Sequence, residues 1–234
     1  MKFDFKNLLI ESKQTLLSPK TYFSAMPKTG GYAEPVIKTL IYSFLSGCII
    51  FIWSILGVDS ASGLGKSAII KHPVLALVFL FVIALLLLII SLICGGDKSY
   101  ETNLRVQASM FVLMPISALI SVLYGVNPYI GIFISIVLNL FALWIFFNAL
   151  IYGLSAKPLR AKIVVGIFTA GFIVLFVLAI IALRFTEKFT GTMMNKGILT
   201  PEDIQEMKQN PEEAQQKIQE LMQQYMQEYN KAKK

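Results

Sequence analysis

The sequence has few residues that could build a catalytic or metal centre. Its 234 residues include one histidine and two cysteines, and only 15% are charged. His72 has no cluster of histidine, cysteine or carboxylate residues beside it to complete a metal site. Cys48 and Cys94 fall in or at the end of apolar segments, where they are expected to pack in a membrane without indicating a redox compartment. No HExxH or glycine-rich nucleotide motif after a strand occurs, so we expect no enzyme and no cofactor.

Ionisable residues are also missing from the middle of the long apolar runs. Such residues usually mark ion and proton pathways, so a pump or an ion-coupled carrier is not expected. The formal net charge is +7, but aromatic residues are not interleaved with the basic ones on a soluble segment. We therefore expect no nucleic acid among the partners.

Apolar residues are abundant and make up 56% of the chain. The longest uncharged stretch is 73–93, in which Ser91 is the only polar side chain. As a helix it would span roughly 30 Å at about 1.5 Å per residue, which matches the hydrocarbon core of a bilayer. This stretch is predicted to be a transmembrane helix, and the lipid bilayer is the first expected partner.

Four further stretches have the length and apolarity of spans. Pro115 lies in the middle of one of them and predicts a kink, because proline frees the carbonyl one turn earlier for a serine or an adjacent helix to satisfy. The predicted fold is an all-α membrane protein, a bundle of five transmembrane helices. The other four spans are predicted at 36–57, 104–124, 130–152 and 163–183.

The sequence suggests three parts. Residues 1–35 form a cytoplasmic N-terminal segment, 36–184 the five-helix membrane domain, and 185–234 a helical tail rich in Gln and Glu. The N-terminal segment contains a weak amphipathic helix that either lies on anionic headgroups or packs on the membrane domain. The residues that share one face of this helix are Phe5, Leu8, Leu9, Ser12 and Leu16.

The tail is expected to form two helices, starting near Thr200-Pro201 and Asn210-Pro211. The second carries an apolar stripe that could contact another protein, a second copy of the tail or the membrane surface, or could remain a solvated helix. The candidate contact residues are Ile218, Leu221, Met222 and Tyr225.

Basic residues predict the topology. Most lysines and arginines outside the tail fall in the N-terminal segment and in the loops after the second and fourth spans. This predicts a cytoplasmic N-terminus and, with five spans, a C-terminus on the opposite side of the membrane. Lys38, near the start of the first span, is expected to extend toward the lipid headgroups.

Polar and small residues within the spans are candidate contacts. An asparagine in a span usually hydrogen-bonds another helix, worth roughly 1 kcal/mol, and less often contacts a substrate. Gly166 and Ala170 are four residues apart and would permit close approach of another helix. The candidates for helix packing or partner contact are Arg105, Pro115, Ser117, Asn139, Asn148, Gly166 and Ala170.

Several motifs occur together in a characteristic order. They are Leu17-Ser18-Pro19-Lys20-Thr21-Tyr22-Phe23, Met26-Pro27, Gly30-Gly31, Glu34-Pro35, Gly95-Gly96 with Tyr100 and Leu104-Arg105-Val106, Pro115, and Lys157-Pro158-Leu159-Arg160-Ala161. Over about residues 16 to 183 this order resembles the Yip1 domain family of polytopic membrane proteins. The short N-terminal segment is more similar to that of bacterial members, and the tail is not part of the family pattern.

The resemblance implies a five-helix domain with no known catalytic activity. Eukaryotic relatives are associated with vesicle trafficking and small GTPases, and some bacterial relatives accompany membrane transport systems. We therefore expect a non-enzymatic adaptor or accessory subunit of a transport complex in the plasma membrane. A homo-oligomer of this chain is a further expectation. One alternative is a self-contained transporter of an uncharged or lipid-like molecule, with a cavity lined by Asn139 or Asn148 and Ser117. Another is a trafficking factor of the Golgi or ER membrane, if the chain is eukaryotic.

Overall fold

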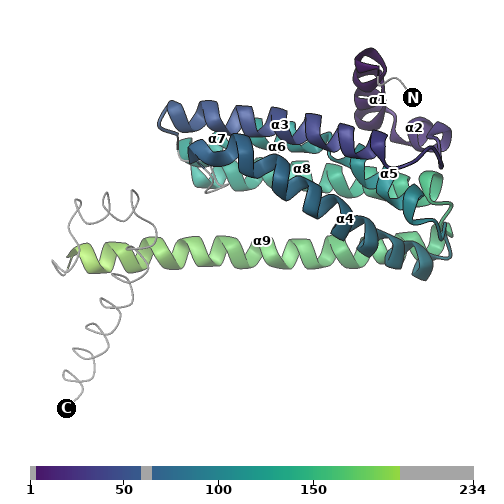
Figure 1. Ribbon diagram of the computed structural model, residues 1–234. Helices are drawn as coiled ribbons and strands as arrows, with labels where there is room; N and C mark the ends of the chain where they lie inside the picture. The colour runs from purple at the N-terminus through teal and green to yellow at the C-terminus, as the bar shows by residue number, and fades with distance from the viewer. Residues whose placement is uncertain (1–3, 59–64, 196–234) are drawn as a thin grey trace. The chain divides into compact units, whose positions relative to one another are not determined.

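The structure is a computed structural model that describes residues 4–58 and 65–195, and every regular element in these ranges is helical (Figure 1). Five helical stretches there are long and apolar enough to cross a membrane. Each of the five predicted spans overlaps one of them, which confirms an all-α, multi-pass membrane protein. The five stretches are Ala33–Ile55, Ala68–Cys94, Tyr100–Val126, Pro128–Gly153 and Pro158–Thr186.

Two short helices precede the spans, the third span is built from three helices, and the fourth ends in a π-helix. In chain order the elements are α1 (Phe5–Leu17), α2 (Pro19–Ala25), α3 (Ala33–Ile55), the 3-10 helix η1 (Gly65–Ser67), α4 (Ala68–Cys94), α5 (Tyr100–Met110), α6 (Leu113–Ile120), α7 (Val122–Val126), α8 (Pro128–Asn148), the π-helix η2 (Ala149–Gly153) and α9 (Pro158–Asn195).

The chain divides into two compact units within α9. The first unit is Met1–Ile173 and the second is Val174–Lys234, and each is described by itself. The described part of the second unit is the rest of α9, which continues as helix through the predicted domain boundary at 184/185. The predicted tail contacts Ile218, Leu221, Met222 and Tyr225 lie outside the described residues.

Pro115 breaks the third span in the turn before the proline. α5 ends at Met110 and α6 begins at Leu113. Because proline has no N–H, the carbonyl of Phe111 loses its usual helical donor. That carbonyl instead accepts a hydrogen bond from the Met114 N–H at 2.9 Å. The helix is therefore interrupted where the kink was predicted, and the donor to the freed carbonyl comes from the same turn and not from a serine or a neighbouring helix.

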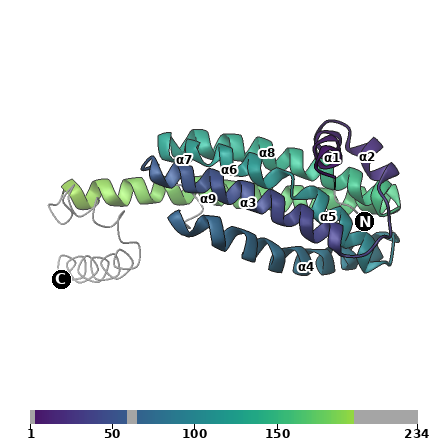
Figure 2. The same ribbon diagram turned by 45° about the horizontal axis from the view of Figure 1, so that its top comes forward.

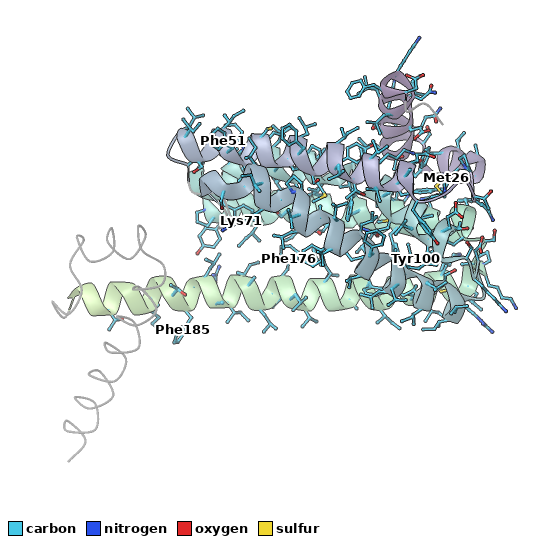
Figure 3. All side chains as sticks on the ribbon, in the orientation of Figure 1. Met26, Phe51, Lys71, Tyr100, Phe176 and Phe185 are labelled. Atoms are coloured by element: carbon cyan, nitrogen blue, oxygen red, sulfur yellow. The ribbon has the colours of Figure 1, made fainter. Side chains whose placement is uncertain are left out.

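The first unit is a bundle in which α3 lies beside α4 in both views (Figures 1 and 2). The two helices approach closely at Gly47, where a Cβ would lie 2.9 Å from the carbonyl oxygen of Ala68. Met26 and Tyr100 lie at one end of this unit, and Phe51 and Lys71 at the other (Figure 3). We call the end with Met26 and Tyr100, which carries α1 and α2, the cap end.

Helix α2 is packed into the bundle at the cap end. Tyr22, Phe23 and Met26 are buried, and Phe23 is only 1% exposed. They join a core with Leu150 and Leu154 of the segment that follows α8. The Tyr22 hydroxyl lies 2.6 Å from Ser109 Oγ of α5, and burial raises the pKa of the Tyr22 phenol, which keeps it neutral.

Helix α1 lies next to α2 and has one face on the bundle. Leu8 and Thr15 are buried, and Ser12 Oγ lies 2.6 Å from the hydroxyl of Tyr42 on α3. Phe5 and Leu9, which were expected on the same face, are exposed. Of the two interpretations left open by the sequence, packing on the membrane domain is therefore observed. A contact of Phe5 and Leu9 with anionic headgroups stays a prediction.

We predict that Phe23→Ala lowers the free energy of unfolding by about 3 to 5 kcal/mol, because it leaves a cavity in the core under α2. The measurement is an unfolding titration of the purified protein in mild detergent. Phe5→Ala is the matched control, since the Phe5 side chain is 59% exposed and leaves no core cavity when shortened. Equal stability of the two variants would show that α2 is not anchored through Phe23.

Candidate functional site

A carboxylate of the first span holds two buried cations at the cap end. Glu34 Oε2 lies 2.8 Å from Arg105 Nη1 of α5, and Glu34 Oε1 lies 2.7 Å from Lys38 Nζ one turn along α3. The Arg105 and Lys38 side chains are 3% and 8% exposed. Burying a charge without a partner is very costly, so Glu34 ties the first span to the third.

Arg105 also fixes the loop before the first span. Its Nη2 donates to the carbonyl oxygen of Gly31 at 3.0 Å, and its Nε lies 3.4 Å from Glu101 Oε1. The same Glu101 oxygen accepts the Gly31 N–H at 2.6 Å. A Cβ at Gly30, whose φ is +141°, would lie 2.6 Å from Arg105 Nη2. The backbone conformation therefore favours glycine at position 30, and any larger residue would also displace the guanidinium of Arg105.

Lys38 extends this arrangement to α1, because its Nζ lies 2.5 Å from Glu11 Oε2. The expectation that Lys38 reaches the lipid headgroups is wrong, since two carboxylates hold it inside the protein. We call Glu11, Glu34, Lys38, Glu101 and Arg105 the ion-pair cluster. It joins α1, α3 and α5 at one point, and its three carboxylates outnumber its two cations.

Two loops meet beside this cluster. The Asp97 N–H donates to the Leu154 carbonyl at 2.6 Å, and the Lys157 N–H donates to the Cys94 carbonyl at 3.0 Å. Nζ of Lys28, from the loop after α2, lies 3.7 Å from Oδ2 of Asp97. The N-terminal segment and the loops after the second and fourth spans thus share the cap end, as the charge-based topology requires.

A half-open apolar pocket of about 370 Å³ lies in the first unit. Its walls come from α4, α5, α8 and the part of α9 before residue 174. Gln107 and Asn139 are the polar residues among those that line it. This pocket is therefore suited to a largely apolar molecule.

The predicted site residues fall in different places. Arg105 belongs to the ion-pair cluster, Pro115 marks the break in the third span, and Asn139 lines the pocket. Ser117 is exposed and Asn148 is buried, and neither lines the pocket. The pocket thus contains Asn139 without Asn148 or Ser117, and the transport cavity stays a prediction.

The asparagine side chains bond within their own helix. Asn139 Nδ2 donates to the Ser135 carbonyl and Asn148 Nδ2 to the Trp144 carbonyl, each at 2.8 Å. A role of either in joining helices stays a prediction. Gly166 and Ala170 are exposed on α9, and their contact with a partner also stays a prediction.

Sequence reasoning missed the carboxylates of the cluster and Gln107. A signal for two of the carboxylates was present, because Glu34 and Lys38, and likewise Glu101 and Arg105, are four residues apart. A Glu four residues before a cation stabilises a helix start. No local pattern indicated Glu11, whose partner lies on another helix, or the burial of Gln107 beside a pocket.

No family model, curated protein or solved structure matches this chain. The resemblance to the Yip1 domain family therefore stays a prediction that rests on the motifs alone.

We predict that Arg105→Met destabilises the protein by about 3 kcal/mol. The change removes the positive charge paired with the Glu34 and Glu101 carboxylates and the hydrogen bond to the Gly31 carbonyl oxygen. Thermal or denaturant unfolding in detergent measures the change. The matched control is Lys28→Met, which removes an exposed ion pair with Asp97 and should cost less than about 1 kcal/mol. If Arg105→Met were no more destabilising than Lys28→Met, the ion-pair cluster would not hold the cap end together.

Proposed function

We propose that this protein is a non-enzymatic integral membrane adaptor, an accessory subunit that packs against a membrane transport complex and assists it. The observation that carries the proposal is the environment of Gly166 in the last span. No described atom lies within 4 Å of the position that a Cβ would take at Gly166, outside the adjoining helix backbone. This glycine is therefore not explained by packing within the described part of the chain.

The glycines of earlier spans are different. A Cβ at Gly131 would lie 2.7 Å from Tyr124 Cγ, and one at Gly153 would lie 3.2 Å from Val106 Cγ2. Gly47 is equally restricted by Ala68. In these spans a glycine permits two elements of the same chain to approach closely. By the same reasoning, Gly166 permits the approach of a helix that belongs to another protein.

The residues around Gly166 fit this interpretation. Ala170 lies about 40° from Gly166 around α9, and Ile163, Ile167 and Ile173 complete an exposed face of the helix. We call these five residues the α9 face. Exposed isoleucines would also suit lipid, but the small residues among them favour a protein helix, because they let backbones come into contact.

The proposed partner is a spanning component of a transport complex, and the proposed location is the plasma membrane. The resemblance to bacterial Yip1 relatives, some of which accompany transport systems, supports this choice. Lys28, Lys98 and the basic residues 157, 160 and 162 belong to the segments that meet at the cap end. The positive-inside rule then favours a cytoplasmic cap end and N-terminus, with the C-terminus on the opposite side after five spans.

We predict that Gly166→Leu abolishes co-purification of this partner in mild detergent, because the larger side chain keeps the two helices apart. The protein is purified from its native membranes and its companions are identified by mass spectrometry. The expected companion with the unaltered protein is an integral membrane component of a transporter. The Gly166→Leu variant should still fold, since Gly166 is exposed and no described atom outside the adjoining helix backbone lies within 4 Å of the Cβ position.

Gly171→Leu is the matched control. Gly171 is also without a described neighbour within 4 Å, but it lies about 140° from Gly166 around the helix. Association should survive this change. A protein that purifies alone, or only with further copies of itself, would contradict the adaptor proposal, and so would equal loss of the partner in both variants.

A further inference from the structure

The apolar pocket contains an amide that lacks a partner. Gln107 is 7% exposed, its amide atoms are accessible from the pocket, and none of the side-chain hydrogen bonds among the described residues involves it. An unsatisfied amide in apolar surroundings costs about 1 to 3 kcal/mol, so it is unusual unless something outside the chain bonds to it. The side chain offers two donor hydrogens and one acceptor oxygen to an occupant of the pocket.

Asn139 supplies a second polar group in the same pocket. Its Nδ2 is engaged with the Ser135 carbonyl, which leaves its carbonyl oxygen as an acceptor. Gln107 belongs to α5 and Asn139 to α8, and apolar side chains such as Leu87 and Phe146 complete the walls. An apolar pocket with a few polar groups from different helices is the usual form of a small-molecule site.

The side chains that line the pocket indicate the charge of the molecule that it can bind. No acidic or basic side chain is among the described residues that line the pocket. A charged group there would be unpaired at low dielectric, which is far more costly than burying a hydroxyl or carbonyl with a hydrogen-bond partner. The occupant is therefore uncharged at its polar group.

The depth of the two amides selects among membrane molecules. Gln107 is the eighth residue of the third span, so it lies about 10 Å along the helix from the span's start at Tyr100. Asn139 is near the middle of the fourth span. The phosphate of an ordinary phospholipid stays in the headgroup region, outside the hydrocarbon core, and would not reach these groups. A hydroxyl or carbonyl on an apolar chain can lie at this depth.

We propose that the pocket binds a neutral amphiphilic lipid, an apolar chain with one uncharged hydrogen-bonding group such as a hydroxyl or a carbonyl. The polar group bonds to the Gln107 amide, and the chain runs past Asn139 and fills the space between α4, α8 and the first part of α9. The lipid site is formed by this chain alone, so the lipid proposal can be tested independently of the adaptor proposal.

The test is photolabelling of the purified full-length protein in lipid nanodiscs. Three diazirine probes are compared: a long-chain alcohol, the hydrocarbon of the same length without the hydroxyl, and a phosphatidylcholine. The alcohol should label peptides of α4 and α8 that line the pocket, and unlabelled alcohol should compete. Labelling in the pocket by the alcohol should exceed that by the other two probes about tenfold, as expected for a hydrogen bond to one amide in an apolar site.

Variants distinguish recognition from general lipid contact. Gln107→Leu with Asn139→Leu should reduce labelling by the alcohol about tenfold, to the level of the hydrocarbon. Ala142→Phe should block the pocket for the alcohol and the hydrocarbon alike, because Ala142 lines it. Asn148→Leu is the matched control, since this asparagine lies on the same helix but outside the pocket, and labelling should be unchanged.

Stability of the lipid-free protein provides a second measurement. Gln107→Leu should leave the melting temperature unchanged or raise it, because it removes an amide that has no partner among the described residues. Loss of labelling together with a higher melting temperature would mark Gln107 as a ligand-binding residue and not a structural one. Equal labelling by all three probes, or labelling by the alcohol that is insensitive to the double variant or to Ala142→Phe, would overturn the proposal.

Discussion

The shared carboxylate of Glu34 is the interaction on which the cap end depends. It places one oxygen on Arg105 and the other on Lys38, two cations that are almost fully enclosed by protein. Neither cation could be buried at the start of a span without such a partner. Once Arg105 is held, it positions the backbone of Gly31, and once Lys38 is held, it positions Glu11 and with it α1. The N-terminal segment is therefore part of the membrane domain and not an appendage to it.

This dependence follows from the solvent. In a bilayer, apolar surface gains little by leaving lipid for protein, so helices need close packing and polar contacts to associate in a defined way. The first unit has both. Gly47 brings α3 against the start of α4, and the ion-pair cluster joins α3 to α5 at the cap end. Among the described residues, the highly apolar α4 has no such charged contact within its span, and its position is set by close packing and by the loop contacts near Cys94.

The spans and the break at Pro115 were predictable, because both depend on local properties: length, apolarity and a missing N–H. The ion-pair cluster was only half predictable. The spacing of Glu34 and Lys38 indicates a pair on one helix, but the contact between Glu34 and Arg105 joins residues far apart in the chain. The pocket was harder still. Asn139 and Asn148 lie on opposite sides of α8, as nine residues require, and only the packed bundle shows that Asn139 is the one beside a cavity.

Helix α9 relates the two proposals, because its part before residue 174 has two distinct sides. Phe168 and Phe172 line the pocket, whereas Gly166 and Ala170 belong to the exposed α9 face. At about 100° per residue, Phe168 lies roughly 200° from Gly166, on the opposite side of the helix. A lipid in the pocket and a partner helix on the α9 face would therefore not compete for the same surface. The lipid would cover the side of α9 that faces the pocket, and the partner helix would cover the α9 face.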